Sequence, residues 1–384
     1  MHETGLARAG ALLSIDLGAV RANYRLLRQR LGGAACAAVV KADAYGLGAE
    51  EVAPALTAEG CRHFFVAHLD EAIALRPHVP AAAEIFVLNG VPPGAEAECA
   101  ERRVTPVLNG LGQVGSWTSL ARSRGRPLPA IMQVDTGMSR LGLARAELAT
   151  LADDPRLLEG VALRFVMSHL AYAERQDHPL NAEQLARFDA ARALLPAAPA
   201  SLANSSGTFL GEAYRFDLAR PGAALYGIAP VAGQPNPMRP VVRLQGRVIQ
   251  VREVEAGATV GYGASWRALG PRRIATVSVG YADGYPRELS NRATAFAGDT
   301  PVPLVGTVSM DTATFDVTDT PDGAVAPGGF IDLIGPRNPV DALAAQAGTI
   351  GYEILTGLGR RYARRYVGGP EWRAQASSPQ QEPV

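Results

Sequence analysis

The chain has 384 residues and a mass of 40.3 kDa, well above the typical ~150 residues of one domain, so we expect two domains. Hydrophobic residues make up 47% and charged residues 19% of the chain, a balance typical of globular rather than disordered proteins. The 37 basic side chains are matched by 37 acidic ones, which argues against nucleic acid or an anionic membrane as a partner.

No stretch approaches the ~18 consecutive apolar residues of a membrane span, and the first twenty residues lack a secretory signal pattern. We therefore expect a cytoplasmic protein with no membrane partner. Its cysteines, Cys36, Cys61 and Cys99, have neither CxxC spacing nor an accompanying His pair. We expect them to be reduced core residues, and we expect no metal site.

The first ~230 residues alternate short apolar runs with longer segments of helical apolar spacing. This alternation is typical of βα units around a parallel sheet. The candidate strands end, in chain order, at Lys41, Ala67, Asn89, Asn109, Asp135, His169, Asn204 and Arg220. Eight strands with helical returns predict a (β/α)8 TIM-type barrel, an α/β fold, over residues 1–235.

From about residue 238 the sequence becomes a series of apolar runs separated by Gly and Pro. Only DALAAQAG (341–348) and IGYEILTGLGRRYARR (350–365) have helical patterns. The Pro-rich segment 227–240 predicts a linker. We therefore expect a mostly β domain over residues 236–367, followed by a disordered polar tail at 368–384.

In barrels of this kind the working residues follow the carboxyl ends of the strands. Here those ends carry Lys41, Arg140, His169, Asn204 and Arg220. The segment RPGAALYG (220–227) places a glycine before a helix start, where backbone N–H groups hold anions. A lysine amine and a phosphate site at one barrel mouth indicate pyridoxal phosphate, whose aldehyde forms a Schiff base with lysine. By its position alone, Lys41 would more commonly be a solvated surface lysine. The residues around it therefore decide between a surface lysine and a cofactor lysine.

Those neighbours form a recognisable motif. The string VVKADAYGLG (39–48) resembles the cofactor-lysine motif of alanine racemases, and the resemblance continues through residues 12 to 367. The matching strings are VDTGMSRLG (134–142), SH (168–169), ANSS (203–206), RPGAALYG (220–227), VGYGASW (260–266), VGYADGYPR (279–287), GTVSMD (306–311) and GYEILTGLGRRY (351–362). The resemblance implies an isomerase (EC 5.1.1.1) that interconverts L-alanine and D-alanine on pyridoxal 5'-phosphate, for peptidoglycan precursors or for alanine catabolism.

The resemblance also implies two catalytic bases. Lys41 would hold the cofactor and, once freed by the substrate, act as a base on one face of the α-carbon. Tyr262 of the partner subunit would act on the other face, so a homodimer would share its active sites. Arg220 would contact the pyridine nitrogen, and His169 would link Arg220 to Tyr262.

The same resemblance assigns the remaining site residues. The cofactor, mainly its phosphate, would be held by donors at Tyr45, Asn204, Ser205, Gly222, Ala223 and Tyr352. Arg140 would bind the substrate carboxylate. The partner subunit would add Met310, Asp311 and Tyr281, and a narrow entrance at Tyr281 and Tyr352 would restrict the substrate to a methyl side chain.

Three positions depart from the family pattern. Gln133 stands where many members have a lysine that becomes a carbamate and orients the arginine. We expect the Gln133 side-chain oxygen, or a bound anion such as chloride, to contact Arg140 instead. Leu47 and Ser201 each stand where a histidine is common, which bears on rate and fine specificity.

Other functions are compatible with parts of this pattern. A broad-specificity racemase or a decarboxylase of basic amino acids would use a similar barrel, although the decarboxylase would need a cysteine in the second domain. All three cysteines precede that domain. A non-catalytic protein that binds the cofactor would need only the barrel, and it would have no use for a second base at Tyr262.

Overall fold

The computed structural model describes residues 7–368, and contacts divide the chain into two compact units. One unit, the barrel unit, contains residues 20–225 and 229–238. The other, the β unit, contains the N-terminal segment through residue 19, residues 226–228 and the chain from residue 239. This division differs from the expected one at the N-terminus, because the first strand pairs with strands of the β unit. The proposed tail lies almost wholly outside the described residues.

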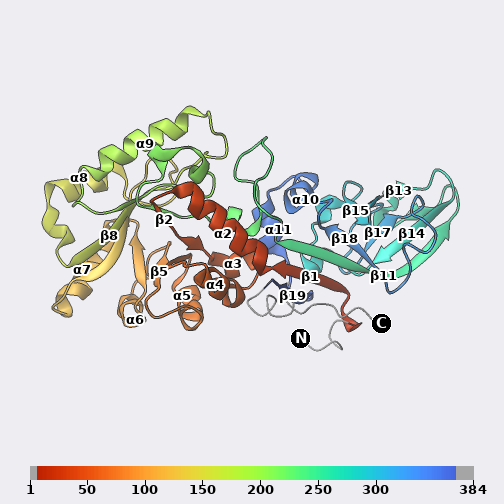
Figure 1. The fold of residues 1–384 in the computed structure, drawn as a ribbon, viewed down its shortest axis with the longest axis horizontal. Coiled ribbons are helices and arrows are strands. Elements are labelled where there is room, and N and C mark those ends of the chain that lie inside the picture. Colours follow the sequence, from red (N-terminus) through yellow and green to blue (C-terminus); the bar gives the residue numbers. More distant parts are fainter. Residues whose placement is uncertain (1–6, 369–384) are drawn as a thin grey trace, which may run out of the picture. The chain divides into compact units, whose positions relative to one another are not determined.

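The barrel unit is built on parallel strands (Figure 1). They are β2 (Ala35–Cys36), β3 (Ala38–Val39), β4 (His63–Val66), β5 (Glu84–Val87), β6 (Thr105–Leu108), β7 (Leu128–Gln133), β8 (Val161–Met167), β9 (Ala200–Ser201) and β10 (Leu218–Ala219). Strands β3 to β9 form one sheet in chain order, and every pair in it is parallel. These strands are buried on both faces, which explains their continuous apolar runs.

Hydrogen bonds at the two ends of this sheet close it. Strands β2 and β3 are one extended segment interrupted at Ala37, whose N–H donates to the Ala219 carbonyl at 2.9 Å. Strand β10 pairs with β2, and the Asp217 N–H before β10 donates to the carbonyl of Ala200 in β9 at 3.0 Å. With β2 and β3 counted as one strand, the structure confirms the predicted eight-stranded barrel.

Helices lie around the outside of these strands (Figure 1). They are α2 (Leu17–Leu31), α4 (Ala49–Ala58), α5 (Leu69–Leu75), α6 (Glu96–Glu101), α7 (Leu111–Ser123), α8 (Arg145–Asp153) and α9 (Pro179–Arg192). The short element α3 (Lys41–Gly46) directly after β3 is a left-handed turn rather than a regular α-helix. Short 3-10 turns are η1 (Arg76–His78), η2 (Pro155–Leu158), η3 (Gly207–Phe209), η4 (Glu212–Tyr214) and η5 (Ala223–Tyr226). Each helix follows a strand or its loop, so the carboxyl ends of the strands share one mouth.

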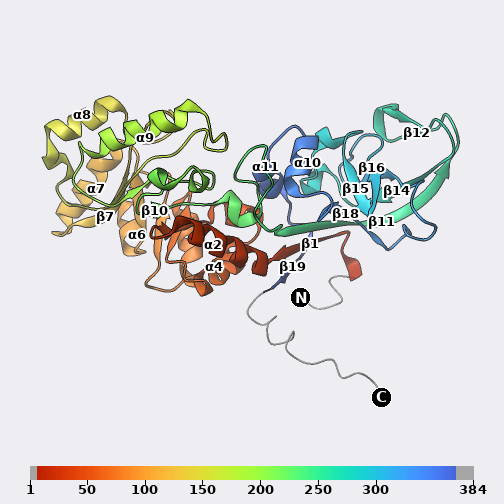
Figure 2. The same cartoon turned by 45° about the horizontal axis from the view of Figure 1, so that its top comes forward.

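The β unit is mostly β, as predicted. Its strands are β1 (Ala11–Asp16), β11 (Val242–Val254), β12 (Thr259–Val260), β13 (Trp266–Arg267), β14 (Arg272–Val277), β15 (Thr294–Ala297), β16 (Thr300–Pro303), β17 (Ala313–Asp316), β18 (Phe330–Ile334) and β19 (Ala363–Val367). Strand β1 lies between β11, which it pairs antiparallel, and β19, which it pairs parallel. Helices α10 (Val340–Gln346) and α11 (Gly351–Gly357) pack side by side (Figure 2), and the 3-10 turns are η6 (Tyr262–Ala264), η7 (Tyr281–Asp283) and η8 (Arg287–Leu289).

The helix predicted over residues 350–365 is wrong in its second half. Helix α11 ends at Gly357, and residues 363–367 form strand β19. The Gly359 N–H donates to the Asp283 carbonyl at 2.8 Å, and a Cβ at Gly359 would lie 3.1 Å from that oxygen. The two glycines therefore turn the chain out of the helix, and the sheet edge at β1 overrides the local helical pattern.

The three cysteines are free and buried, as expected. Burial raises the pKa of Cys61 and of Cys99 to about 12, so both remain thiols.

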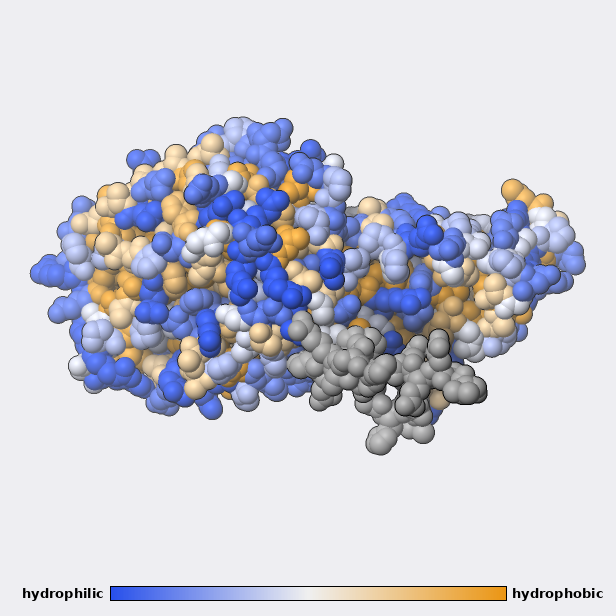
Figure 3. Space-filling view, viewed as in Figure 1, coloured by the Kyte–Doolittle hydropathy of each residue, from blue (hydrophilic) through white to orange (hydrophobic). Residues whose placement is uncertain are grey.

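No helix among residues 7–368 combines the length and apolar character needed to cross a bilayer. Figure 3 shows hydrophilic and hydrophobic residues interspersed over the visible face.

Candidate active site

Lys41 follows β3 directly and begins an unusual turn. The four residues after it, 42–45, have φ between 53° and 57°, so the backbone makes a left-handed turn without glycine. A left-handed conformation costs roughly 1–2 kcal/mol for each such residue. The Ala44 N–H donates to the Val40 carbonyl at 2.9 Å, and the Asp43 carboxylate accepts the Ala49 N–H at 2.7 Å. Local bonds therefore hold a conformation that the residues themselves disfavour.

Lys41 is also the single lysine of the chain, so no other lysine could form the Schiff base. Burial lowers the pKa of its amine below the usual value, and the positive charge of Arg140 lowers it further. The Glu71 carboxylate acts in the opposite direction and raises this pKa. A depressed pKa increases the neutral, nucleophilic fraction of an amine, as covalent chemistry at a carbonyl requires.

A small polar cradle lies near this turn. The Ser205 hydroxyl oxygen accepts the N–H of Gly222 at 3.0 Å and the N–H of Ala224 at 3.2 Å. A Cβ at Gly222 would lie 2.4 Å from the hydroxyl oxygen of Tyr45, so only glycine admits that side chain here. The Ser205 O–H proton is not used in any hydrogen bond among residues 7–368. The cradle thus brings hydroxyl donors together beside η5, a suitable site for an anion.

Asn204 shapes this cradle. Its side-chain oxygen accepts the Gly207 N–H at 2.9 Å, and its amide donates to the Leu170 carbonyl at 3.3 Å. Its backbone carbonyl accepts the N–H of Thr208 at 3.1 Å. Asn204 thus holds the loop that carries Ser205 and joins it to the residues after β8, and its contact with the cofactor stays a prediction.

Arg220 is a buried cation with fixed partners. Its guanidinium donates to the Ser201 hydroxyl and, at 2.6 Å, to the Ser168 carbonyl, and it lies 6.0 Å from the centre of the Phe65 ring. Burial lowers its pKa to about 10, so it remains protonated near neutral pH. Ser201, noted above only as a departure from a common histidine, is thus a direct partner of this arginine.

The His169 imidazole is held neutral. Burial, and then the charges of Arg220, Arg140 and Lys41, lower its pKa to about 3. No hydrogen bond joins this ring to Arg220 in the part of the chain that the structure describes. Ser201 and the Ser168 carbonyl accept from the guanidinium in the single chain, and the link from Arg220 through His169 to Tyr262 stays a prediction.

Arg140 stands on a loop built by Asp135. One Asp135 carboxylate oxygen accepts the N–H groups of residues 137, 138 and 139 at 2.9, 3.0 and 3.1 Å. The Arg140 side chain that follows is exposed and has no hydrogen bond or ion pair within residues 7–368. The Gln133 amide donates to the Leu141 carbonyl at 3.1 Å and makes no hydrogen bond to Arg140. The expected oxygen contact is absent, and an anion at Arg140 stays a prediction.

The remaining predicted residues lie on the β unit. The Tyr262 side chain in η6 is 75% exposed and borders a groove of about 340 Å³ lined also by Ser309 and Thr312. The Tyr281 N–H donates to the Ser309 carbonyl at 3.0 Å, and the Ala282 N–H donates to the Met310 carbonyl at 3.0 Å. The neighbouring loops of η7 and residues 309–311 are thereby joined.

Asp311 and Tyr352 complete this set. Arg361 donates to Asp311 at 2.7 Å and to the buried Asp283 carboxylate at 2.6 Å, which fixes Asp311 at the end of its loop. Tyr352 lies in α11 with 36% of its surface exposed.

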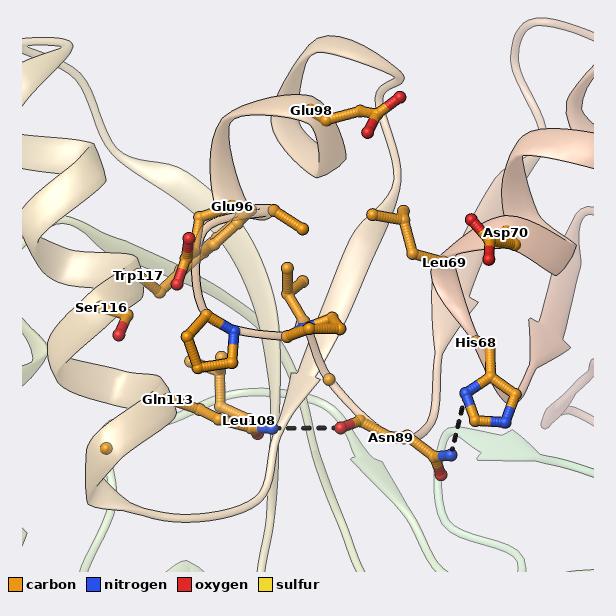
Figure 4. A pocket seen from close by; sticks show the side chains of 16 residues that line it. His68, Leu69, Asp70, Asn89, Glu96, Glu98, Leu108, Gln113, Ser116 and Trp117 are labelled. Atoms are coloured by element: carbon orange, nitrogen blue, oxygen red, sulfur yellow. Dashed lines mark hydrogen bonds between the residues drawn. The ribbon is translucent and has the colours of Figure 1, made fainter.

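A larger hollow, of about 660 Å³, lies on the barrel unit where the loops after β4, β5 and β6 meet (Figure 4). The Asn89 amide lies 3.5 Å from a nitrogen of His68, and the Asn89 carbonyl accepts the Gln113 amide at 3.1 Å. Asp70 at the start of α5 borders the same hollow. None of the predicted site residues lines it.

The residues of the barrel unit fit pyridoxal phosphate. A lone amine of depressed pKa suits the aldehyde, the Ser205, Gly222 and Tyr45 cradle suits the phosphate, and buried Arg220 suits the ring nitrogen. A TIM-type barrel with this site and a separate β domain defines a class of pyridoxal-phosphate enzymes.

Comparisons with known proteins identify the family. Models described as "Alanine racemase, N-terminal domain" and "Alanine racemase, C-terminal domain" match residues 15–230 and 241–366. A catabolic alanine racemase of Mesorhizobium japonicum is 54% identical over 363 residues, 94% of this chain and 95% of its own. An alanine racemase of Rhodospirillum rubrum is 53% identical over 96% of this chain and 99% of its own.

Solved structures similar to this chain are also alanine racemases. A Bartonella henselae alanine racemase with covalently bound pyridoxal phosphate is 44% identical, with a TM-score of 0.91, over 94% of this chain and 100% of that one. A biosynthetic alanine racemase of Pseudomonas aeruginosa is 37% identical, with a TM-score of 0.87, over 93% of this chain and 99% of its own. The chain belongs to the alanine racemase family. It is an isomerase of class EC 5.1.1.1 with pyridoxal phosphate as its cofactor.

Proposed function

We propose that the protein interconverts L-alanine and D-alanine with two bases, Lys41 and Tyr262, in a site shared between two subunits. The observation that carries the proposal is the single lysine of the chain, half-buried at the barrel mouth with a lowered pKa. Pyridoxal phosphate, when bound, withdraws electrons from the substrate α-carbon and so makes its proton acidic. The residues described above would bind the cofactor and the substrate, orient them, and transfer the α-proton.

Lys41 is the base on one face. Its Nζ would hold the cofactor in the resting enzyme, and the freed amine would accept the α-proton of the substrate. A base must be neutral to accept a proton, and burial together with Arg140 lowers the pKa of the Lys41 amine toward that state. For the reverse reaction the protonated amine returns the proton to the same face.

Tyr262 of the partner subunit is the acid and base on the opposite face. Racemisation needs proton removal from one face and return to the other, so a second group is chemically required. Support comes from exposure: Tyr262, Tyr281 and Met310 are large side chains left 75%, 44% and 54% exposed in one chain. A homodimer in which each β unit completes the other subunit's site would give these side chains a partner.

Arg220 favours racemisation over other fates of the substrate. Its guanidinium donates a hydrogen bond but keeps its proton, so it would stabilise charge on the ring nitrogen less than a carboxylate-paired, protonated nitrogen does. With a weaker electron sink at the ring nitrogen, Arg220 would favour rapid return of the α-proton over transamination or decarboxylation.

The cradle and the exposed arginine orient the ligands. Tyr45, Ser205, the N–H of Ala223 and Tyr352 would hold the phosphate. The Gly222 N–H, also expected to do so, donates to the Ser205 hydroxyl oxygen in this structure, and the absence of a side chain at Gly222 leaves room for Tyr45. Arg140, which has no hydrogen-bond or ion-pair partner among residues 7–368, would bind the substrate carboxylate.

On the partner's side, Met310 and Asp311 would border the substrate carboxylate. Tyr281 and Tyr352 would narrow the entrance to methyl-sized side chains. Asp311 is held for this role by Arg361 at 2.7 Å.

The reaction would supply D-alanine for peptidoglycan precursors or serve alanine catabolism; the relatives include both a catabolic and a biosynthetic enzyme. We place it in the cytoplasm, which the three free, buried cysteines support, because thiols persist in reducing compartments. The roles of the two domains, a cofactor-binding barrel within residues 1–235 and a β-rich domain within residues 236–367 that supplies the second base, are part of this proposal, although residues 11–16 pair with strands of the β unit.

One experiment tests the proposal and its rivals. Purified protein with pyridoxal phosphate is incubated with L-alanine, L-serine or L-lysine, and loss of optical activity is followed. Fast loss with alanine alone supports the proposal, whereas equal loss with all three indicates a broad-specificity racemase. Borohydride reduction should attach the cofactor to the one peptide that contains Lys41; attachment without any racemisation would favour a cofactor-binding protein.

A further inference from the structure

Glu71 connects the turn after Lys41 to a helix that carries no predicted site residue. One carboxylate oxygen of Glu71 accepts the Ala42 N–H at 2.7 Å. The other accepts the N–H groups of Ala67 and His68 at 2.6 and 3.1 Å. The last two bonds cap the start of α5, an ordinary role for a glutamate in the first turn of a helix. The bond to Ala42 is different, because it reaches 29 residues back to the position that follows Lys41.

The bond to Ala42 falls where the backbone begins its disfavoured conformation. Ala42 is the first of the four left-handed residues, with φ 53° and ψ 47°. Alanine has no side chain that could hydrogen-bond locally to support this conformation, unlike Asn or Asp. The Ala42 N–H therefore depends on Glu71 both for its hydrogen bond and for its orientation. A small rotation here would swing the Cα–Cβ bond of Lys41 and displace its amine.

The same carboxylate affects the amine through its charge. Burial and Arg140 lower the pKa of Lys41, and Glu71 is the neighbouring group that raises it. Asp70 provides an internal comparison. It is adjacent on α5 and exposed toward the hollow of Figure 4, and it is absent from the causes of the Lys41 shift.

We propose that Glu71 is a positioning residue for Lys41: its carboxylate holds the left-handed turn through Ala42 and thereby fixes the direction and the charge of the lysine amine. This rests on the proposed role of Lys41 as the cofactor lysine. We assign Glu71 no contact with the cofactor or the substrate. It acts through one backbone N–H and through its negative charge.

The first test measures the amine without the cofactor. Because the chain has one lysine, growth with lysine labelled with ¹³C at Cε gives a single side-chain NMR signal, whose pH titration reports Lys41 directly. We expect Glu71→Gln to lower the pKa of Lys41, since the charge that raises it is gone, and Asp70→Asn to leave the titration unchanged. Equal titrations in wild type and Glu71→Gln would overturn the electrostatic part. This result does not depend on racemase activity, so it stays informative even if the proposed function fails.

The second test measures positioning. Covalent attachment of added pyridoxal phosphate to the full-length apo chain is followed by absorbance on the pH plateau where the amine is neutral in every variant. We expect Glu71→Gln to slow attachment by roughly tenfold, the size of one hydrogen bond to a charged group. Asp70→Asn should attach at the wild-type rate. Attachment by Glu71→Gln at the wild-type rate would refute the positioning role.

A double variant separates positioning from simple helix capping. Glycine adopts left-handed φ without a Cβ penalty, so Ala42→Gly should relieve the strain that Glu71 holds. The defect of Glu71→Gln should then shrink to about threefold or less in the Ala42→Gly background. Full additivity of the two changes would show that Glu71 only caps α5. If Glu71→Gln fails to fold, Glu71→Asp serves instead: it keeps the charge but shortens the reach, so it should keep the titration and slow attachment, and normal attachment would contradict the proposal.

Discussion

Replacing Gly222 by alanine should separate cofactor binding from folding. The new Cβ would lie 2.4 Å from the Tyr45 hydroxyl oxygen, 3.0 Å from Tyr45 Cζ and 3.2 Å from Val39 Cβ. Ordinary contact begins near 3.4 Å, so the Tyr45 hydroxyl must retreat by about 1 Å. Overpacking of this kind costs about 1–3 kcal/mol. A displaced hydroxyl would also lose the hydrogen bond that we propose it donates to the phosphate, worth about 1.5–3 kcal/mol for a charged acceptor.

The expected result of Gly222→Ala is therefore a loss of pyridoxal phosphate affinity of roughly tenfold to hundredfold, with a modest loss of stability. Equilibrium titration by absorbance and thermal unfolding of the apo chain measure the two quantities. Gly115→Ala is a matched control, because Gly115 lies inside α7 and a methyl group added there would meet nothing within 4 Å. It should gain about 0.5–1 kcal/mol of stability and bind normally. A wild-type affinity of Gly222→Ala for pyridoxal phosphate would refute the proposal that this cradle binds the phosphate.

Three further predictions concern other parts of the site. Tyr262→Phe should keep cofactor binding and lose racemisation by roughly 10²–10⁴-fold; full retained activity would contradict the second base. The His169 pKa of about 3 in the folded chain, against 6.5 when unfolded, means that the unfolded chain binds the extra proton, so stability falls as pH drops below 6.5. This contributes at most about 2 kcal/mol between pH 6.5 and 5, and denaturant titrations of His169→Gln should lack that part of the acid sensitivity; parallel pH profiles would argue against a neutral buried ring. Crystals grown with bromide should give an anomalous signal beside Arg140, and a map with neither an anion nor the Gln133 oxygen there would remove our explanation for the missing carbamate.

Much of the fold could be predicted because its signals are local. The eight strand ends at the barrel mouth follow from apolar runs bounded by polar residues, and they place Lys41, His169 and Arg220 at one mouth. The strand at Ala363–Val367 could not be predicted, because its pairing partner β1 lies about 350 residues away in sequence. The local pattern of residues 350–365 is equally compatible with a helix.

The site was less predictable in its supporting contacts. Motifs mark Lys41, Arg220 and Gly222, but the partners of Arg220 depend on where Ser201 and the Ser168 carbonyl lie in space. Glu71 carries no motif signal at all. Its one sequence clue is its place three residues after the polar position that begins α5, which predicts a helix cap and says nothing of Lys41. The left-handed backbone at Ala42 could not be predicted either, because alanine does not favour positive φ.

Strand β1 also determines the order in which the protein can form during synthesis. Residues 20–225 contain every strand of the barrel, and they emerge before most of the β unit. Residues 11–16 emerge earlier still, yet their hydrogen-bonding partners at 242–246 and 363–367 are translated only after the barrel. The β unit is therefore complete only when the chain is, and a fragment starting at residue 239 would lack an inner strand of its own sheet. If the two units are expressed separately, strand β1 should stay with the β unit, for example by joining residues 11–16 to the C-terminal fragment.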